Sequence, residues 1–165
     1  VHGAPQHFGR CITLVEGHIR AMDDLYHGRV LELASDIPHV GRLDAPDGAA
    51  TKVSRVCGSV VTVELKLAGG VVSEIAVHPK ACALGQAATA VLAMHAIGAA
   101  PAEIRDARDA LRAMLKGEGA PPQGRFWELR HLEAVRDYPA RHASTMLAFD
   151  AAVEALDAAQ RAQAS

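Results

Sequence analysis

The sequence predicts an α+β fold, in which helices pack on one face of a small, mostly antiparallel three-stranded sheet. Two observations carry this expectation. Apolar and polar residues alternate over residues 61–67, and Gly69-Gly70 separates this run from a second strand-like run over residues 71–78, as in a β-hairpin. Residues 82–97 form a nearly unbroken apolar run of helical length, which is typical of a buried central helix.

The first residues of the chain differ from the rest. Residues 1–21 show no clean hydrophobic period and contain scattered glycine and proline. We interpret them as an N-terminal extension, either an expression tag or the product of a misassigned start, and residues 22–160 as one domain. Cys11 lies in the extension, where we interpret it as a free thiol on a loose arm.

The predicted domain opens on a helix and reaches the sheet through a loop. We expect the helix to run from Met22 to about Asp36, because Pro38 follows and the residue before a proline avoids the helical region. The polar, Pro- and Gly-containing residues 44–52 then predict a loop that leads to a first strand near residues 53–56.

Proline and glycine set the boundaries in the middle of the chain. Pro79 is expected to end the second strand of the hairpin, and Gly98 to follow the last turn of the central helix. Pro101 opens an amphipathic helix, since proline is tolerated in the first turn. Its apolar stripe is predicted to consist of Ile104, Ala107, Leu111 and Leu115.

Two further helical segments complete the chain. Residues 126–132 predict a short helix, with Trp127 expected to anchor the neighbouring loop to the body of the protein. The last helix is predicted to run from about Pro139 to Ala159, with its apolar residues facing inward.

Composition excludes several classes of function. The net charge is −2 and the pI is near 6.5, which argues against nucleic acid or an anionic membrane surface as a partner. No apolar run reaches the ~20 residues of a membrane-spanning helix. The three cysteines do not form a disulfide framework, so we expect a reducing, cytoplasmic environment.

Two cysteines flank the hairpin and are the strongest candidates for chemistry. Cys57 precedes the first strand, and Cys82 follows the second strand at the start of the central helix. Because the hairpin folds the chain back on itself, the two thiols are expected to approach one another. A helix N-terminus also favours a thiolate, since its free N–H groups stabilise negative charge.

Three short segments resemble the U-type iron–sulfur scaffold family, which comprises the NifU N-terminal domain, IscU and SufU. The family carries Cys-Gly-Asp before a hairpin, a second Cys at a helix start and a third Cys near the start of the last helix. The matching segments here are Cys57-Gly58-Ser59, Cys82 and Pro139-Ala140-Arg141-His142-Ala143-Ser144. Ser59 therefore stands in place of the acid and Ser144 in place of the third Cys.

The resemblance implies a function in iron–sulfur cluster assembly. It implies a scaffold or carrier, a monomer or homodimer, that receives sulfur from a cysteine desulfurase and holds a 2Fe–2S cluster or iron. The cargo would then pass to a downstream carrier or apo-protein. Cys57 and Cys82 would be the ligands, and Cys57 the persulfide acceptor. Ser59 and Ser144 would occupy the two degenerate ligand positions.

Hydroxyl groups bind iron and zinc weakly, so other donors are considered for the missing ligands. His142 is a candidate, being two residues before Ser144, and His78 is a weaker one; His95 is interpreted as a packed, hydrogen-bonded histidine. Two alternatives stay open: a zinc-dependent, SufU-like sulfur acceptor that speeds a desulfurase, and a degenerate paralogue that binds family partners without metal.

Overall fold

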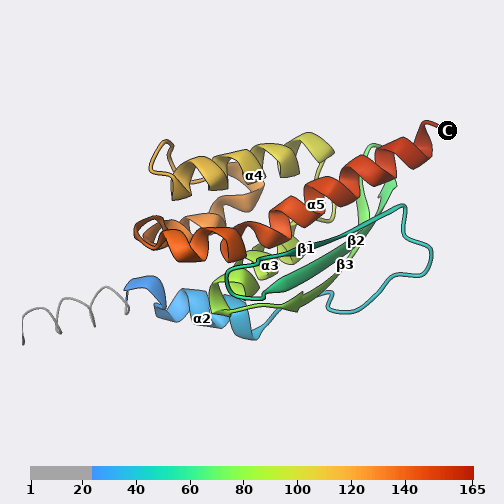
Figure 1. The fold of residues 1–165 in the computed structure, drawn as a ribbon. Helices are drawn as coiled ribbons and strands as arrows, with labels where there is room; N and C mark the ends of the chain where they lie inside the picture. Colours follow the sequence, from blue (N-terminus) through green and yellow to red (C-terminus); the bar gives the residue numbers. More distant parts are fainter. Residues whose placement is uncertain (1–23) are drawn as a thin grey trace, which may run out of the picture.

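The computed structural model describes residues 24–165, in which a three-stranded sheet is covered by helices (Figure 1). Our interpretation of residues 1–21, with Cys11, and the predicted helix start at Met22 lie outside the described residues. The elements in chain order are α2 (Gly28–Ser35), β1 (Gly48–Val53), β2 (Val60–Ala68), β3 (Val71–Lys80), α3 (Ala83–His95), α4 (Pro101–Leu115), the 3₁₀ segments η1 (Gly124–Asp137) and η2 (Pro139–Arg141), and α5 (His142–Gln163).

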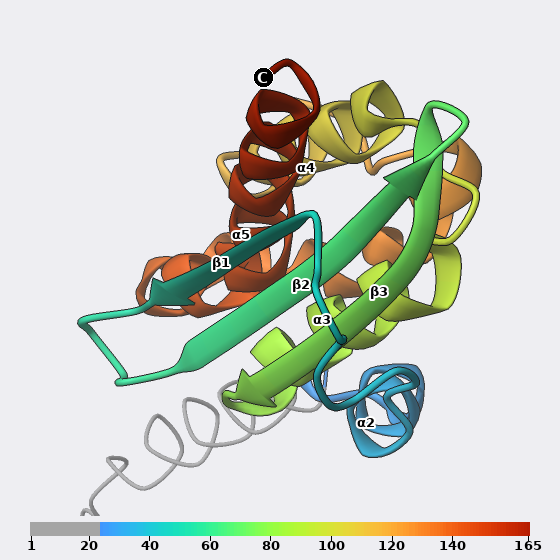
Figure 2. The same ribbon diagram turned by 90° about the vertical axis from the view of Figure 1, so that its right-hand side faces the viewer.

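The predicted fold class is confirmed. The strands lie in the order β1-β2-β3 and both neighbouring pairs are antiparallel. The alternating residues Val61, Val63 and Leu65 of β2 are fully buried. Helices lie behind the sheet in Figure 2, where α5 packs on β1 and β2, α3 packs on β3, and α4 packs on α5. The period of two therefore places one face of β2 in the core.

Helix α3 is the buried central helix, as its composition predicts. It packs against α2, α5, η1 and β3, and its buried residues include Leu84, Val91 and Leu92. Among its last residues, His95 lies at the edge of the core and contacts Glu128, which confirms its interpretation as a packed, hydrogen-bonded histidine. Helix α3 ends at His95, two residues before the predicted end.

The prediction for the first strand is wrong in position. Strand β1 covers Gly48–Val53, within the segment predicted as a loop, whereas residues 54–59 form the turn between β1 and β2. Gly48 explains the difference, because a Cβ built there would lie 1.9 Å from the backbone oxygen of Ala155 in α5. The small residues allow α5 to lie directly on this strand, and that long-range contact leaves no alternating signal in the sequence.

Two boundaries differ for local reasons. Strand β3 continues past Pro79 to Lys80, because Pro79 points its nitrogen to the outer edge of the sheet. Two residues earlier the Val77 N–H points the same way and donates to the carbonyl oxygen of His39, so proline costs no ladder bond. Helix α2 begins at Gly28 after a break at Tyr26, later than predicted.

Trp127 lines a surface hollow with Pro121 and Pro122 of the loop that it was predicted to anchor, and its neighbour Phe126 enters the core. Trp127 is 41% exposed, with the Arg130 guanidinium 4.5 Å from its ring centroid. Phe126 is buried and packs edge-on against Phe149 of α5, with ring centroids 5.5 Å apart. The apolar stripe of α4 is buried as predicted.

Residues 39–41 pair with the outer edge of β3, and the chain then crosses the outer face of the sheet, on the side away from the helices (Figure 2). Gly41 N–H donates to Val77 O at 3.0 Å, and Leu43 N–H donates to the Glu64 carboxylate at 2.8 Å. Glu64 is consequently buried although it lies on the outer face. None of the helices within residues 24–165 is long and apolar enough to cross a membrane.

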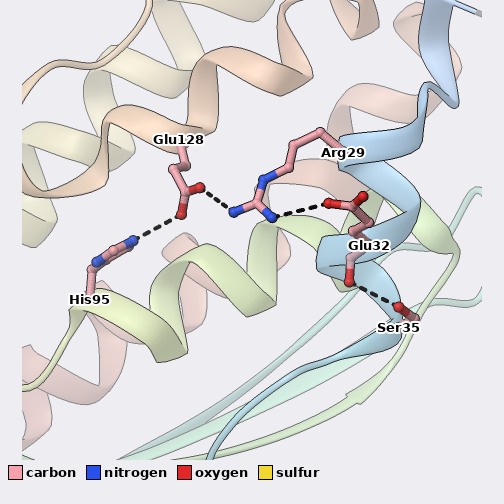
Figure 3. A network of polar contacts seen from close by, with 5 residues as sticks. All are labelled: Arg29, Glu32, Ser35, His95 and Glu128. Atoms are coloured by element: carbon pink, nitrogen blue, oxygen red, sulfur yellow. Dashed lines mark hydrogen bonds and ion pairs between the residues drawn. The ribbon is translucent and has the colours of Figure 1, made fainter.

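A buried carboxylate joins three elements at the end of α3 (Figure 3). Glu128 of η1 is 5% exposed and accepts from Arg29 of α2 and from His95 of α3, the latter at 3.0 Å. Arg29 also reaches Glu32 at 3.3 Å, and the Ser35 hydroxyl donates to the Glu32 backbone oxygen at 2.9 Å. We call Arg29, Glu128 and His95 the Glu128 network.

Candidate functional site

Three segments distant in the sequence meet at one end of the sheet. They are the β1–β2 turn over residues 54–59, the start of α3 and the start of α5, all at the lower left of Figure 2. The pairing of Val53 with Val60 closes the turn and fixes its position at the strand ends. The turn carries Cys57, and the two helix starts carry Cys82 and Ser144.

The turn holds Cys57 between two serines. Gly58 N–H donates to Ser54 O and Ser54 N–H donates to Ser59 O, both at 2.8 Å. Gly58 has a φ of +72°, a conformation that glycine adopts without strain. The Cys57 sulfur lies 3.1 Å from Ser59 Oγ and 3.4 Å from Ser54 Oγ. Both serines are buried while Cys57 is exposed, so the turn presents one thiol to solvent on a support of hydroxyl groups.

The helix starts bring the second thiol to Ser144. Cys82 is the N-cap residue of α3, and its sulfur lies 3.6 Å from Ser144 Oγ. The Ser144 hydroxyl donates to the Arg141 backbone oxygen at 3.1 Å. Gly85 permits this close approach, because a Cβ built there would lie 3.0 Å from the Ser144 backbone oxygen. We call Ser54, Cys57, Ser59, Cys82 and Ser144 the cysteine–serine cluster.

The serines also change the acidity of Cys57. Hydrogen bonds from Ser54 and then Ser59 lower the pKa of Cys57 from 9.0 to about 7, and Ser144 contributes in the same direction. Partial desolvation opposes the shift without cancelling it. Cys57 is therefore more readily ionised at neutral pH than an ordinary cysteine, and the thiolate is the nucleophilic form.

The candidate histidines lie elsewhere. The His142 ring is 2.9 Å from Val135 O and 3.1 Å from Arg136 O, and it lines a hollow with Leu115 and Met146 on the α4 side. His78 is exposed on β3 opposite Thr62. Across residues 24–165, no three His, Cys, Asp or Glu side chains are grouped closely enough to hold a metal ion.

The cysteine–serine cluster has too few strong donor atoms for a resident zinc ion. A zinc site takes four ligands, drawn from Cys, His, Asp and Glu. The cluster offers two thiols and neutral hydroxyl groups. These residues do not fit a resident zinc ion.

Sequence reasoning missed Ser54 and the backbone of Arg141. Ser54 lies three residues before Cys57 in the turn, and its backbone pairing with Ser59 could have been inferred only from the correct strand register. The Arg141 backbone oxygen accepts from the hydroxyl groups of Ser144 and Thr145, at 3.1 and 2.8 Å.

These features define a class of protein: a three-stranded α+β domain with two thiols presented from a strand turn and a helix start. The family model of the NifU-like N terminal domain matches residues 25–158. This match covers most of the chain, and the chain belongs to that family.

Known proteins of this family are similar over most of their length. A crystal structure of a nitrogen-fixing NifU-like protein (N-terminal) from Brucella abortus is 48% identical, with a TM-score of 0.83, and the match covers 86% of this chain and 98% of that one. The iron-sulfur cluster assembly scaffold protein IscU of Streptococcus pyogenes serotype M1 is 25% identical over 86% of this chain and 89% of its own. IscU of Thermotoga maritima is 26% identical over 80% and 92%.

Proposed function

We propose that this protein is a carrier in iron–sulfur cluster assembly that receives sulfur from a cysteine desulfurase as a persulfide on Cys57. The observation that carries the proposal is the exposed Cys57 thiol, whose pKa is lowered to about 7 by the serines beside it. Membership of the NifU-like family and the similarity to proteins named as cluster assembly scaffolds support it.

The chemistry of sulfur transfer suits Cys57 better than Cys82. A desulfurase presents its sulfur as a persulfide on a cysteine, and the acceptor must attack the outer sulfur as a thiolate. Cys57 is exposed on a turn, whereas Cys82 is half-buried at the N-cap of α3. Val53 and Val56, at 56% and 74% exposure, flank the turn and give a partner an apolar surface beside the thiol.

Iron or a 2Fe–2S cluster would be cargo of this protein and not a resident cofactor. Cys57 and Cys82 supply two thiolates, half of the four that such a cluster takes. Ser59 and Ser144 are weak donors at the positions where the family carries an acid and a third Cys. A cluster held here would draw its remaining ligands from a second copy or from the downstream carrier or apo-protein, and we place this exchange in the cytoplasm.

The test of the proposal is sulfur transfer in solution. The chain, carrying Cys11→Ser so that only two thiols remain, is mixed with a cysteine desulfurase and ³⁵S-cysteine, and label is measured after non-reducing separation. We expect label on the Cys82→Ser variant, whose persulfide cannot be attacked by a second thiol, and none on Cys57→Ser. Equal labelling of Cys57→Ser would overturn the assignment of Cys57, and no labelling of any variant would overturn sulfur acceptance.

Binding of a cluster is a second candidate function, favoured by the position of two thiols at the end of the sheet where Ser144 lies. Anaerobic purification with iron, sulfide and zinc analysis tests it. We expect Cys82→Ser to lose any bound iron, and Ser144→Cys to raise metal content by adding the third family thiol. Zinc alone at one ion per chain would favour the zinc-dependent sulfur acceptor. Neither metal nor sulfur label, with a desulfurase still bound, would leave the paralogue without metal.

A further inference from the structure

The only two thiols of residues 24–165 lie at the same end of the sheet as the buried hydroxyl of Ser144. Ser144 Oγ lies 3.6 Å from the Cys82 sulfur, and Ser144 is among the groups that lower the pKa of Cys57. Ser144 is itself fully buried and fixed by its bond to the Arg141 backbone oxygen. Val60 pairs with Val53 on one side and with Lys80 on the other, so the β1–β2 turn that carries Cys57 and the N-terminus of α3 that carries Cys82 lie at the same end of the sheet.

We propose that Cys82 is a resolving thiol, which attacks the persulfide on Cys57 and releases the transferred sulfur as sulfide. This activity rests on the proposed function for the way in which Cys57 acquires its sulfur. It uses the two cysteines in different roles, Cys57 as the acceptor and Cys82 as the reductant. The product is a disulfide between Cys57 and Cys82.

The step balances without an outside reductant. The Cys82 sulfur attacks the inner sulfur of the Cys57 persulfide, a Cys57–Cys82 bond forms, and the bond to the outer sulfur breaks. The outer sulfur leaves as hydrosulfide, HS⁻, with both electrons of the broken bond, and the Cys82 proton passes to solvent. Two thiol equivalents are oxidised as one sulfane sulfur is reduced. A dithiol reductant returns the chain to its starting state.

The positions of the two cysteines favour Cys57 as the sulfur acceptor and Cys82 as the thiol that attacks it. Cys82 is half-buried at the N-cap of α3, where its sulfur lies beside Ser144 and at the same end of the sheet as the turn that carries Cys57. Cys57 lies on an exposed six-residue turn with glycine beside it, so its sulfur can move toward Cys82 and the released sulfide faces solvent. The serines at the other two positions offer no third thiol that would compete for the persulfide.

The experiment supplies the sulfur chemically, so that it does not depend on a desulfurase. The chain with Cys11→Ser is treated with glutathione persulfide, desalted and sampled over time. Alkylation with intact mass spectrometry reports the persulfide and the disulfide, and a colorimetric assay reports free sulfide. The Cys82→Ser variant is the matched control, because serine is a favourable N-cap residue and preserves the helix start. The Ser144→Ala variant tests whether the Ser144 hydroxyl contributes to the rate of sulfide release.

We expect the parent to release about one sulfide per persulfide formed and to gain one disulfide, at a rate at least ~10-fold above that of Cys82→Ser. Cys82→Ser should keep its persulfide, and Ser144→Ala should release sulfide more slowly than the parent. A persulfide that lasts equally long in the parent and in Cys82→Ser overturns the inference. Sulfide release from glutathione persulfide without any labelling by the desulfurase would support this activity and reject the proposed sulfur donor.

Discussion

The Glu128 network and the cysteine–serine cluster are two polar groups of residues at opposite ends of α3. They differ in the charge and the burial of their central side chain. Glu128 is a buried charge that is paired on both sides, by Arg29 and by His95. The cysteine–serine cluster contains no carboxylate and no basic side chain, and its reactive group, Cys57, is exposed. One grouping joins elements, and the other presents a thiol.

The neighbouring groups lower the pKa of Glu128 and the pKa of Cys57 in different ways. Burial raises the pKa of Glu128, but the hydrogen bonds from Arg29 and His95 outweigh this and hold it below its ordinary value. Neutral groups, the side chains of Ser54 and Ser59 and the backbone of Ser59, lower the pKa of Cys57, which is only slightly buried. A fully paired carboxylate stays ionised at neutral pH, whereas a thiol with a pKa near 7 gains and loses its proton readily. Stability is therefore expected to depend on the Glu128 network and reactivity on the cysteine–serine cluster.

The largest effect is expected from breaking the Glu128 network. Glu128→Ala removes the shared acceptor and should lower the free energy of unfolding by about 2 kcal/mol, because buried polar partners lose their hydrogen bonds. Urea unfolding measures the change. Glu32→Gln is the matched control, since Glu32 is 69% exposed and contacts the same Arg29; its loss should stay below about 0.5 kcal/mol. Equal losses for the two variants would contradict a special role for Glu128.

Packing at the cysteine–serine cluster gives the next effect. Gly85→Ala places a Cβ 2.9 Å from the Ala81 Cβ and 3.0 Å from the Ser144 backbone oxygen, so α3 and α5 must separate. We expect a net loss of about 1 kcal/mol in urea unfolding, the crowding being offset in part by the better helix propensity of alanine.

The control for this packing prediction is Gly28→Ala, because nothing lies within 4 Å of a Cβ at Gly28. That variant should be as stable as the parent or slightly more stable. A Gly85→Ala protein of unchanged stability would mean that the two helix starts do not depend on a glycine for their approach.

Acid should affect the two regions differently. Because the folded-state pKa of Glu128 lies below its unfolded value, its stabilisation is complete above the unfolded pKa of about 4.3 and is lost as pH falls through the folded pKa. Stability measured from pH 7 to pH 3 should therefore fall below about pH 4. Glu128→Gln should flatten this fall, whereas Cys57→Ser should leave it unchanged. A parallel acid response in the parent and Glu128→Gln would remove Glu128 from the explanation.

The smallest effect concerns reactivity and leaves stability nearly unchanged. Ser59→Ala removes a hydrogen bond to Cys57, so its pKa should rise from about 7 toward 9.0. Alkylation with iodoacetamide at pH 7 should slow about fivefold, and the midpoint of its pH profile should move upward. Cys11→Ser serves as the background. Ser73→Ala, whose hydroxyl bonds the Lys66 backbone oxygen instead, should leave the profile in place; a shift there, or none in Ser59→Ala, contradicts the assignment.

The fold was predictable where the pattern is local. The alternation over β2 and the glycine pair after it predicted the hairpin, and the apolar run predicted the central helix. Strand β1 was placed wrongly because Gly48 and its alanine neighbours carry no strand signal, and their strand conformation depends on contact with Ala155.

The candidate site was predictable in its positions more than in its contacts. The resemblance named Cys57, Ser59, Cys82 and Ser144; in the structure Cys57 contacts Ser59, and Cys82 contacts Ser144. Ser54 was missed because its contact depends on the register of the turn. Glu128 was missed because its partners lie 99 and 33 residues away, and no spacing rule connects them.

The two edge strands of the sheet, β1 and β3, differ in whether another strand can pair with them. Residues His39 and Gly41 occupy the outer edge of β3 through Val77, and Pro79 offers no donor there. In the part of the chain that the structure describes, β1 pairs with β2 alone, and its single charge, Lys52, is engaged by Glu154 at 2.7 Å. An unpaired strand edge is a template for an incoming strand. Any extension of this sheet, by a partner peptide or by self-association, is therefore directed to β1, beside the turn that carries Cys57.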